Sequence, residues 1–430
     1  MRETLALLRH EKRARPFFLA LAQSALGTGA GYIALLLIAE ERFASPWAIS
    51  LVLSADLLPA MLLGPIFGAV ADRWSRKRCA ILGDVLRVIA FAGITLVDSF
   101  EATVAFAVLA GTGTGLFTPA ALAALPSVID DRRRLPAATS LYGAVADLGF
   151  IVGPAIAFPV LLFGGPETLM LVNAATFAMS ALLLAPLRFG AAPEKAADVA
   201  PASLLREARE GMRATAGMRA IRIVLLATSA ALFGAGLFNV AELFFAKDDL
   251  GTSDAGFSVL VTFFGLGFVC GSLAGSKGGT RPVLKRRYLI GLLVFGVGFC
   301  ATAAASVYAI AIATFAIAGF GNGLVLVYER LLIQASFADA LVGRVFGVRD
   351  ALTAWAFALA FLSAGGLLEL ISPRELILVA GGIGLVTCAI SAFVLRGEWS
   401  EQEGHPLGDA PLQPELATQE AGSGDSPGRS

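Results

Sequence analysis

The chain has few charged residues. Only 15% of its 430 residues are Asp, Glu, Lys or Arg, whereas 57% are hydrophobic. A soluble domain carries about 25% charged residues, so this composition excludes an ordinary water-soluble domain and favours a membrane protein. Acidic and basic residues balance at 33 each, and the zero net charge by itself indicates no partner. We expect no nucleic-acid partner.

Histidine and cysteine are scarce as well. The two histidines, His10 and His405, lie in polar terminal stretches, so no imidazole is available inside an apolar segment. The four cysteines are scattered through apolar segments without the spacing of a disulfide framework or a metal site. They are Cys79, Cys270, Cys300 and Cys388. We therefore expect small buried thiols, no metal and no cofactor.

The motifs of nucleotide-dependent enzymes are missing. No Gly-rich loop is followed by Lys and then Ser or Thr, so we expect no direct use of ATP. The run Gly111-x-Gly113-x-Gly115 lies inside an apolar segment and does not follow a soluble strand, so it is not a dinucleotide fingerprint. No other catalytic constellation is present, and we expect the protein not to be an enzyme.

Long apolar segments fill most of the chain instead. We predict twelve of them, each about long enough to cross a bilayer as a helix. They cover residues 16–39, 47–70, 79–97, 102–128, 138–163, 168–187, 220–245, 255–276, 287–305, 308–335, 345–370 and 375–395. The alternation typical of membrane β-barrels is absent, so bundled helices are the expected way to span. The predicted fold class is an all-α membrane protein.

Polar stretches suggest how the segments are grouped. We expect two six-helix halves, 1–187 and 220–395, joined by a cytoplasmic linker at 188–219. The linker begins with Ala, Pro, Glu and Lys and then takes on a helical, amphipathic pattern that is typical of the membrane surface. The tail, 396–430, is rich in Gly, Pro, Glu, Gln and Ser, and we expect it to be disordered.

A weak internal repeat relates the two halves. The glycine run that starts at Gly111 has a counterpart that starts at Gly319, and Gly275 is expected to take the place of Asp72. Two halves joined by a polar linker are typical of transporters in which one half rocks against the other. Tandem glycines also allow close packing of helices in lipid, and that reading remains an alternative.

Lys and Arg are distributed unequally between the loops. Only Arg42, Lys247 and Arg374 fall on one side of the predicted bundle. The other side carries the clusters at 9–15, 73–78, 132–134, 206–222, 285–287 and Arg344. Since cytoplasmic loops are enriched in Lys and Arg, we expect a multi-pass protein of the plasma (inner) membrane with both termini cytoplasmic.

One charged hairpin, from Gly68 to Arg78, lies between two apolar segments. Its pattern is Gly, three residues, Asp-Arg, two residues and Arg-Lys, formed by Gly68, Asp72, Arg73, Arg76 and Lys77. A loop that only obeyed the positive-inside rule would need neither the Gly nor the Asp. The pattern resembles the loop between helices 2 and 3 of the major facilitator superfamily, although Ser75 stands where that family usually has a second glycine.

This resemblance implies a twelve-helix secondary transporter whose hairpin belongs to a cytoplasmic gate. We expect Asp72 to meet the helix that begins after Gly343 and Arg344 when the cytoplasmic side is closed. The first turn of that helix exposes N–H groups and a partial positive charge. Glu329 and Arg330, in the inner third of an apolar segment, complete the expected gate.

The fifth apolar segment carries Gly149, Gly153 and Pro154. The two glycines share one helix face and permit a close helix contact, while the proline favours a bend. The trio resembles the Gly-x-x-x-Gly-Pro signature of the superfamily's drug:proton antiporters, which is associated with export. Residues 125–141 and 343–345 similarly resemble the branch that includes enterobactin and macrolide exporters.

Ionisable residues inside apolar segments are candidates for function because they are expensive in lipid. Asp56 and Asp147 are expected near mid-membrane, where desolvation favours a neutral carboxyl group that can bind and release a coupling proton. Arg87 is expected to pair with one of them. It is the candidate substitute for an arginine that related antiporters carry in helix 4, since 106–110 contains none. A static pair that only orients helices remains an alternative. Glu242 is expected at the outer rim.

These expectations combine into one hypothesis about function. The protein is expected to export a small amphipathic molecule (a drug, siderophore or secondary metabolite) against the entry of protons, as a monomer. The cavity candidates, besides the two aspartates, are Gln23, Tyr32, Asn239 and Phe263. An uptake permease for a polar nutrient is one alternative, which the 30 phenylalanines disfavour. A transport-inactive scaffold or sensor is another, although it would not need the aspartates and the hairpin together.

Overall fold

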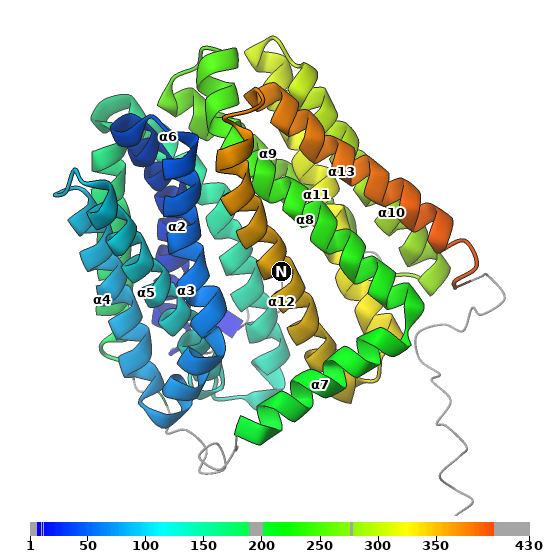
Figure 1. Ribbon diagram of the computed structural model, residues 1–430. Coiled ribbons are helices and arrows are strands. Elements are labelled where there is room, and N and C mark those ends of the chain that lie inside the picture. Colours follow the sequence, from blue (N-terminus) through cyan, green and yellow to red (C-terminus); the bar gives the residue numbers. More distant parts are fainter. Residues whose placement is uncertain are drawn as a thin grey trace, which may run out of the picture.

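The computed structural model describes residues 7–9, 11, 13–187, 189, 201–275 and 278–399. Within these ranges every regular element is a helix (Figure 1). The long helices are α2 (Ala14–Phe43), α3 (Pro46–Arg73), α4 (Arg76–Ile94), α5 (Phe100–Ala124), α6 (Leu135–Leu184), α7 (Pro201–Gly217), α8 (Arg219–Phe244), α9 (Asp254–Gly275), α10 (Arg281–Ala304), α11 (Tyr308–Ser336), α12 (Asp339–Leu367) and α13 (Pro373–Val394). The short turns are η1 (Leu125–Ser127), η2 (Arg132–Arg134) and the π-helical η4 (Phe245–Asp249).

The helix bounds follow most of the predicted apolar segments closely. Helices α10 and α12 begin six residues before the predicted 287 and 345, so Gly343 and Arg344 lie inside α12 and not before it. The segments predicted at 138–163 and 168–187 form the single element α6, which is interrupted at Gly165. This glycine has φ 71° and ψ −179°, a backbone conformation that an L side chain rarely adopts. Pro166 follows it and cannot continue the hydrogen-bond ladder of the preceding helix. The chain therefore turns at Gly165.

Ten helices of the described chain are long and apolar enough to cross a membrane. Helix α6 counts once among them, and α4 is not included. Helix α4 falls short because it carries charged side chains at its start, from Arg76 to Arg78, and again at Asp84 and Arg87. The protein is thus an all-helical membrane protein.

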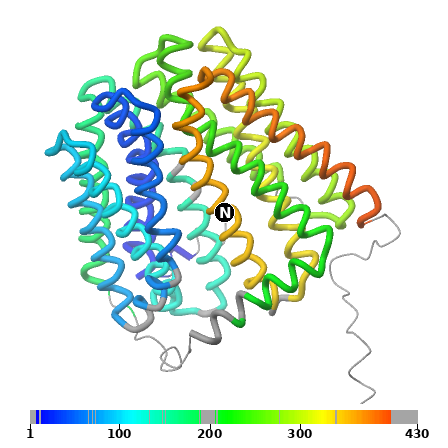
Figure 2. Tube along the Cα trace, viewed as in Figure 1, coloured from blue at the N-terminus to red at the C-terminus, as the bar shows by residue number. Residues whose placement is uncertain are grey.

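The long helices pack into two groups, which we call the first half (α2–α6) and the second half (α8–α13). In the first half α2 packs on α6, and α4 and α3 pack on α5. In the second half α9 and α10 pack on α11, and α12 and α13 pack on α8. The halves meet mainly where α3 contacts α12 and where α6 contacts α9. Figure 2 shows the first half, blue to teal, beside the second half, green to orange.

Close glycine contacts recur at equivalent positions in the two halves. A Cβ atom at Gly111 would lie 2.0 Å from the carbonyl oxygen of Asp56, and one at Gly319 would lie 1.9 Å from that of Phe264. Neither position has room for a side chain, so both glycines are needed for the helix contact. The separation along the chain is the same from Gly111 to Gly319 as from Asp56 to Phe264. The repeat is therefore built into the packing.

The same spacing is found on the far side of the hairpin at 68–78. Gly113 packs on Arg87, and Gly321 packs on Phe295 at the same separation. Within the hairpin the halves differ, because α3 continues to Arg73 whereas α9 ends at Gly275. The assignment of Gly275 to the place of Asp72 therefore stays a prediction.

Helix α7 lies across one end of the bundle, beside α12 (Figure 1). Gly211 packs against the backbone of Arg344, and the Arg344 guanidinium forms an ion pair of 2.6 Å with Glu210. The linker helix is therefore attached to the second half. Parts of the expected linker and of the expected tail lie outside the described residues. They are residue 188, residues 190–200 and residues 400–430.

Candidate functional site

A buried ion pair lies in α4 of the first half. The Arg87 guanidinium is 2.5 Å from the Asp84 carboxylate, and the two side chains are 2% and 0% exposed. The residues are three positions apart, so they lie on one face of the helix. Ser180 of α6 donates a hydrogen bond of 2.7 Å to the second oxygen of Asp84. The carboxylate is thus bound from two helices.

Aromatic rings enclose the arginine of this pair. The guanidinium carbon of Arg87 lies 4.4 Å from the ring centre of Phe117 and 4.2 Å from that of Phe177. Phe91 stacks on Phe177 with ring centres 5.6 Å apart. A planar cation between two ring faces gains cation–π attraction, which offsets part of its loss of hydration. Arg87 is therefore held in place on both faces.

The expectation that Arg87 pairs with Asp56 or Asp147 needs correction. The ion pair of Arg87 is with Asp84, which the sequence analysis did not single out. Asp56 is half-buried and close enough to Arg87 for an electrostatic interaction, but its carboxylate forms no described hydrogen bond or ion pair. The side chain of Asp147 lies outside the described residues. The spacing of Asp84 and Arg87 on one helix was the signal that could have revealed the pair.

The second half has its own buried carboxylate, Glu329 of α11. This side chain is 0% exposed and forms an ion pair of 3.0 Å with Arg349 of α12. Nearby, Thr228 and Tyr288 share a hydrogen bond of 2.9 Å between their hydroxyl groups. Arg330 points away and is exposed. In this structure the described ion-pair partner of Glu329 belongs to the same half, and the expected gate role of Glu329 stays a prediction.

The hairpin at 68–78 is likewise tied to its own half. Arg76 donates a hydrogen bond of 2.8 Å to the carbonyl oxygen of Ala123, at the end of α5. Lys77 donates to the carbonyl oxygen of Ala185, just after α6. The side chains of Asp72 and Arg73 lie outside the described residues, so the expected contact between Asp72 and α12 is not tested.

The glycines of the fifth segment pack α6 against α2. A Cβ atom at Gly149 would lie 2.4 Å from the carbonyl oxygen of Ala25, and one at Gly153 would lie 2.6 Å from the Ala30 nitrogen. Pro154 follows inside the helix. The close approach expected from this motif is present. Its association with export is not tested by the packing.

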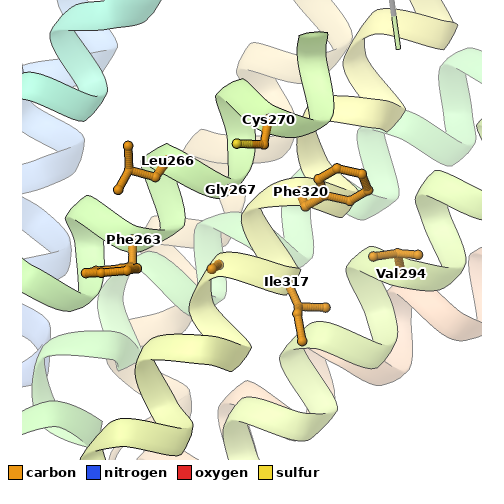
Figure 3. A pocket seen from close by; sticks show the side chains of 8 residues that line it. Phe263, Leu266, Gly267, Cys270, Val294, Ile317 and Phe320 are labelled. Atoms are coloured by element: carbon orange, nitrogen blue, oxygen red, sulfur yellow. The ribbon is translucent and has the colours of Figure 1, made fainter. Parts of the chain in front are cut away.

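The four expected cavity residues do not gather in one place. Gln23 and Tyr32 are half-buried on α2, and Asn239 is half-buried on α8. Phe263 instead lines an apolar groove of about 500 Å³ between α9, α10 and α11, within the second half (Figure 3). The lining residues are Phe263, Leu266, Gly267, Cys270, Val294, Ala316, Ile317 and Phe320.

Tyr32 joins the two halves. Its hydroxyl oxygen lies 3.1 Å from the carbonyl oxygen of Asn239 and 3.1 Å from a carboxylate oxygen of Glu242. Glu242 was expected at the outer rim, but its side chain is only 3% exposed. The sequence could not show this burial, because it depends on α2 packing beside α8, where Tyr32 bonds to Glu242.

The contacts between the halves gather at one end of the molecule. Besides the Tyr32 contact, Lys247 forms an ion pair of 2.5 Å with Glu40. A Cβ atom at Gly365 would lie 2.7 Å from the Ser50 hydroxyl. The described hydrogen bonds of Tyr32 and the described ion pair of Lys247 with Glu40, which join the halves, lie near this end. Toward the opposite end, Cβ positions on α3, α6 and α12 have no atom within 4 Å, at Gly64, Gly68, Gly143, Gly343 and Gly347. Turn glycines such as Gly165 and Gly251 are equally unobstructed, so this observation concerns those three helices and not the end as a whole.

Comparison with known proteins places this arrangement in a family. The model of the Major Facilitator Superfamily matches residues 17–238 and 223–420. The multidrug efflux pump Tap of Mycobacterium tuberculosis (strain H37Rv) is 26% identical over 384 residues, covering 84% of this chain and 89% of the pump. The putative bacilysin exporter BacE of Bacillus subtilis is 26% identical over 375 residues, covering 85% of this chain and 92% of the exporter.

A solved structure shares the fold. The bacterial homologue of the human lysosomal transporter Spinster superposes with a TM-score of 0.70 at 14% identity, covering 89% of this chain and 97% of that chain. The family model spans nearly all of the helical region, and the structural neighbour is a transporter and not an enzyme. The chain belongs to the major facilitator superfamily of membrane transporters.

Proposed function

We propose that the protein is a secondary active exporter of a small amphipathic molecule, such as a drug, a siderophore or a secondary metabolite. Two relatives that align over more than four-fifths of this chain are named as exporters. The glycine and proline motif of α6 resembles the one associated with export, which agrees with this direction of transport.

One observation carries the proposed mechanism. The halves bond to each other near the ends of α2 and α8, and open space lies beside α3, α6 and α12 at the other end. A protein that exposes a central site alternately to each side of the membrane needs its two halves to be bonded at one end and apart at the other. These bonds must also be able to break and form again. The open end carries α7 and the basic hairpin, so we assign it to the cytoplasm.

The proposed topology has twelve crossings. Ten candidate spans become eleven when α6 crosses twice, once on each side of Gly165. Helix α4 supplies the twelfth, because the pairing of Asp84 with Arg87 reduces the cost of its charges in lipid. An even number of crossings puts both termini on one side, which the basic loops identify as the cytoplasm.

The proposed coupling ion is the proton. Asp56 is the most available carrier in the first half, because it is half-buried and its carboxylate has no described hydrogen bond or ion pair. Arg87 lies within electrostatic range and would stabilise Asp56 when it loses its proton. Asp147 remains a second candidate on α6. Asp84 is engaged by both Arg87 and Ser180 and is less free to exchange a proton.

Uptake of a dye into energised inside-out membrane vesicles tests this proposal, because export from the cell becomes uptake when the membrane is inverted. We expect the wild type to accumulate a lipophilic cationic dye, ethidium, when a proton gradient is imposed. The double variant Asp56→Asn/Asp147→Asn should lose this activity at an unchanged protein level. Asp98→Asn, which changes an exposed carboxylate between α4 and α5, is the matched control. Full gradient-driven uptake by the double variant would exclude both aspartates as carriers.

A further inference from the structure

A carboxyl group outside the expected coupling site lies buried between the two halves. Glu242 of α8 is 3% exposed, and its one described side-chain bond is to the hydroxyl of Tyr32 on α2. No cation is in contact with it in the part of the chain that the structure describes. An ionised carboxylate with a single neutral donor is a costly arrangement in a buried site.

The hydrogen bonds around Tyr32 indicate which protonation state of Glu242 fits the structure. The Tyr32 hydroxyl has two oxygen neighbours at 3.1 Å, the Asn239 carbonyl and the Glu242 carboxyl group. A carbonyl only accepts, and a tyrosine hydroxyl has one proton to donate. Both contacts are full hydrogen bonds only if Tyr32 donates to Asn239 and Glu242 donates to Tyr32. Glu242 must then carry a proton.

The charged groups at the same end leave Glu242 without a counter-ion. Lys247 is engaged by Glu40 of α2 at 2.5 Å and by Asp254 of α9 at 2.9 Å. Arg374 of α13 is engaged by Asp249 at 2.6 Å, and Asp248 is exposed.

The ionisable groups on the remaining helices around α8 are occupied as well. Glu329 of α11 and Arg349 of α12 form their ion pair with each other. Asp56 of α3 has Arg87 as its electrostatic partner. Within the described chain, therefore, only Tyr32 responds to the charge of Glu242.

We propose that Glu242 is a proton-binding site whose proton joins the two halves at the closed end through Tyr32. The group takes up a proton from water while this end is open and keeps it while the end is closed. Loss of the proton leaves a buried carboxylate, which regains water only when α2 and α8 separate. Proton binding and closure therefore favour each other, and the coupling is reciprocal. This inference rests on the proposed function in that it requires this end to open and close. The site binds and releases its proton on the same side, so it controls closure and does not itself carry a proton across the membrane.

A distance measurement without any substrate tests the site. Spin labels are attached at Asp98→Cys and Ser306→Cys, two exposed loop positions of the first and second half near the closed end. The four native cysteines are first replaced by alanine. In purified wild-type background we expect the ratio of open to closed forms at this end to rise about tenfold between about pH 5 and about pH 9, equivalent to one pKa unit of coupling.

Variants at the two contacting residues give the decisive comparison. Glu242→Gln keeps an amide that can donate to Tyr32 and cannot ionise, so this end should stay closed at both pH values. Tyr32→Phe removes the link and should weaken the pH response. Glu101→Gln, at the same end, should keep the response because Glu101 is exposed and has no described bond to the other half.

Either of two results would overturn the inference: a wild-type distance that ignores pH, or a Glu242→Gln variant that responds as the wild type does. The outcome is separable from the proposed function. A protein that fails to export ethidium but keeps a Glu242-dependent pH response would contradict the export proposal and leave the proton site standing.

Discussion

The two halves of the molecule share one helix framework and fill it with opposite chemistry. At equivalent positions the first half has charged residues where the second half has apolar ones: Asp56 and Phe264, Asp84 and Leu292, Arg87 and Phe295. Phe91 and Phe299 are unchanged between them. In the second half Phe299 lies 4.3 Å from Phe238 and 4.5 Å from Phe295 between ring centres. A stacked aromatic cluster thus occupies the place of the ion pair.

The difference shows which features belong to the framework and which do not. Close glycine contacts are present in both halves, so the helix arrangement requires them. The framework does not require charges at Asp84 and Arg87, because the second half has apolar residues at those two positions and places its own buried ion pair, Glu329 with Arg349, elsewhere. A buried ion pair adds little net stability, since desolvation consumes most of its attraction. We infer that the first half keeps its charges for transport.

We expect the largest effect when a substitution removes one partner of the ion pair between Asp84 and Arg87. Arg87→Leu leaves Asp84 buried without its cation, and we expect a loss of about 3–5 kcal/mol in the free energy of unfolding. The double variant Asp84→Leu/Arg87→Leu imitates the second half and should recover most of that loss. Denaturant titration in detergent micelles measures both. A double variant as unstable as the single one would show that the two halves do not share an interchangeable framework.

A smaller effect is expected from the hydrogen bond that supports the pair. Ser180→Ala removes a donor to a buried carboxylate, a bond worth about 1.5–3 kcal/mol. Ser258 is the matched control in the second half, because it is fully buried and bonds only to the carbonyl of Ala255 on its own helix. Ser258→Ala should change stability by less than about 0.5 kcal/mol. Equal losses in the same titration would contradict the special role of Ser180.

The smallest expected difference is between the two framework glycines. Gly111→Ala and Gly319→Ala each place a methyl group against a backbone carbonyl, and each should cost about 1–3 kcal/mol. The two losses should be similar, because the contact is the same in both halves. Gly143→Ala, with open space at its Cβ position, should be neutral or slightly stabilising. A large loss in only one half would show that the repeat is not carried by these contacts.

The sequence predicted the helices better than it predicted their partners. Hydropathy determines where a membrane helix begins and ends, and the predicted and observed bounds differ by a few residues. The close contact of Gly149 and Gly153 was also predictable, since a Gly-x-x-x-Gly pair has one main structural use. Neither inference needed knowledge of which helices are neighbours.

Partners of buried ionisable groups could not be predicted in that way. The position of a residue along its helix gives its depth in the membrane, and by this measure Asp56 and Arg87 lie at similar depths. The direction of a side chain around the helix axis cannot be predicted in this way, and Arg87 in fact faces Asp84 and two phenylalanine rings. Ser180 joins from a helix almost a hundred positions away. The burial of Glu242 was missed for the same reason, because its partner Tyr32 lies on α2 in the other half.

The intrahelical pair in α4 has a consequence for biosynthesis. An isolated Arg or Asp near the centre of a membrane helix costs about 2.5–3.5 kcal/mol on insertion scales. Helix α4 leaves the ribosome well before Phe177 and Ser180 are made, so these later contacts cannot assist its entry into the bilayer. Asp84 and Arg87 are three residues apart, and α4 therefore carries the counter-charge with it as it folds. On the proposed twelve-crossing topology, α4 therefore enters the membrane with its two charges already paired, and the contacts with α6 form later.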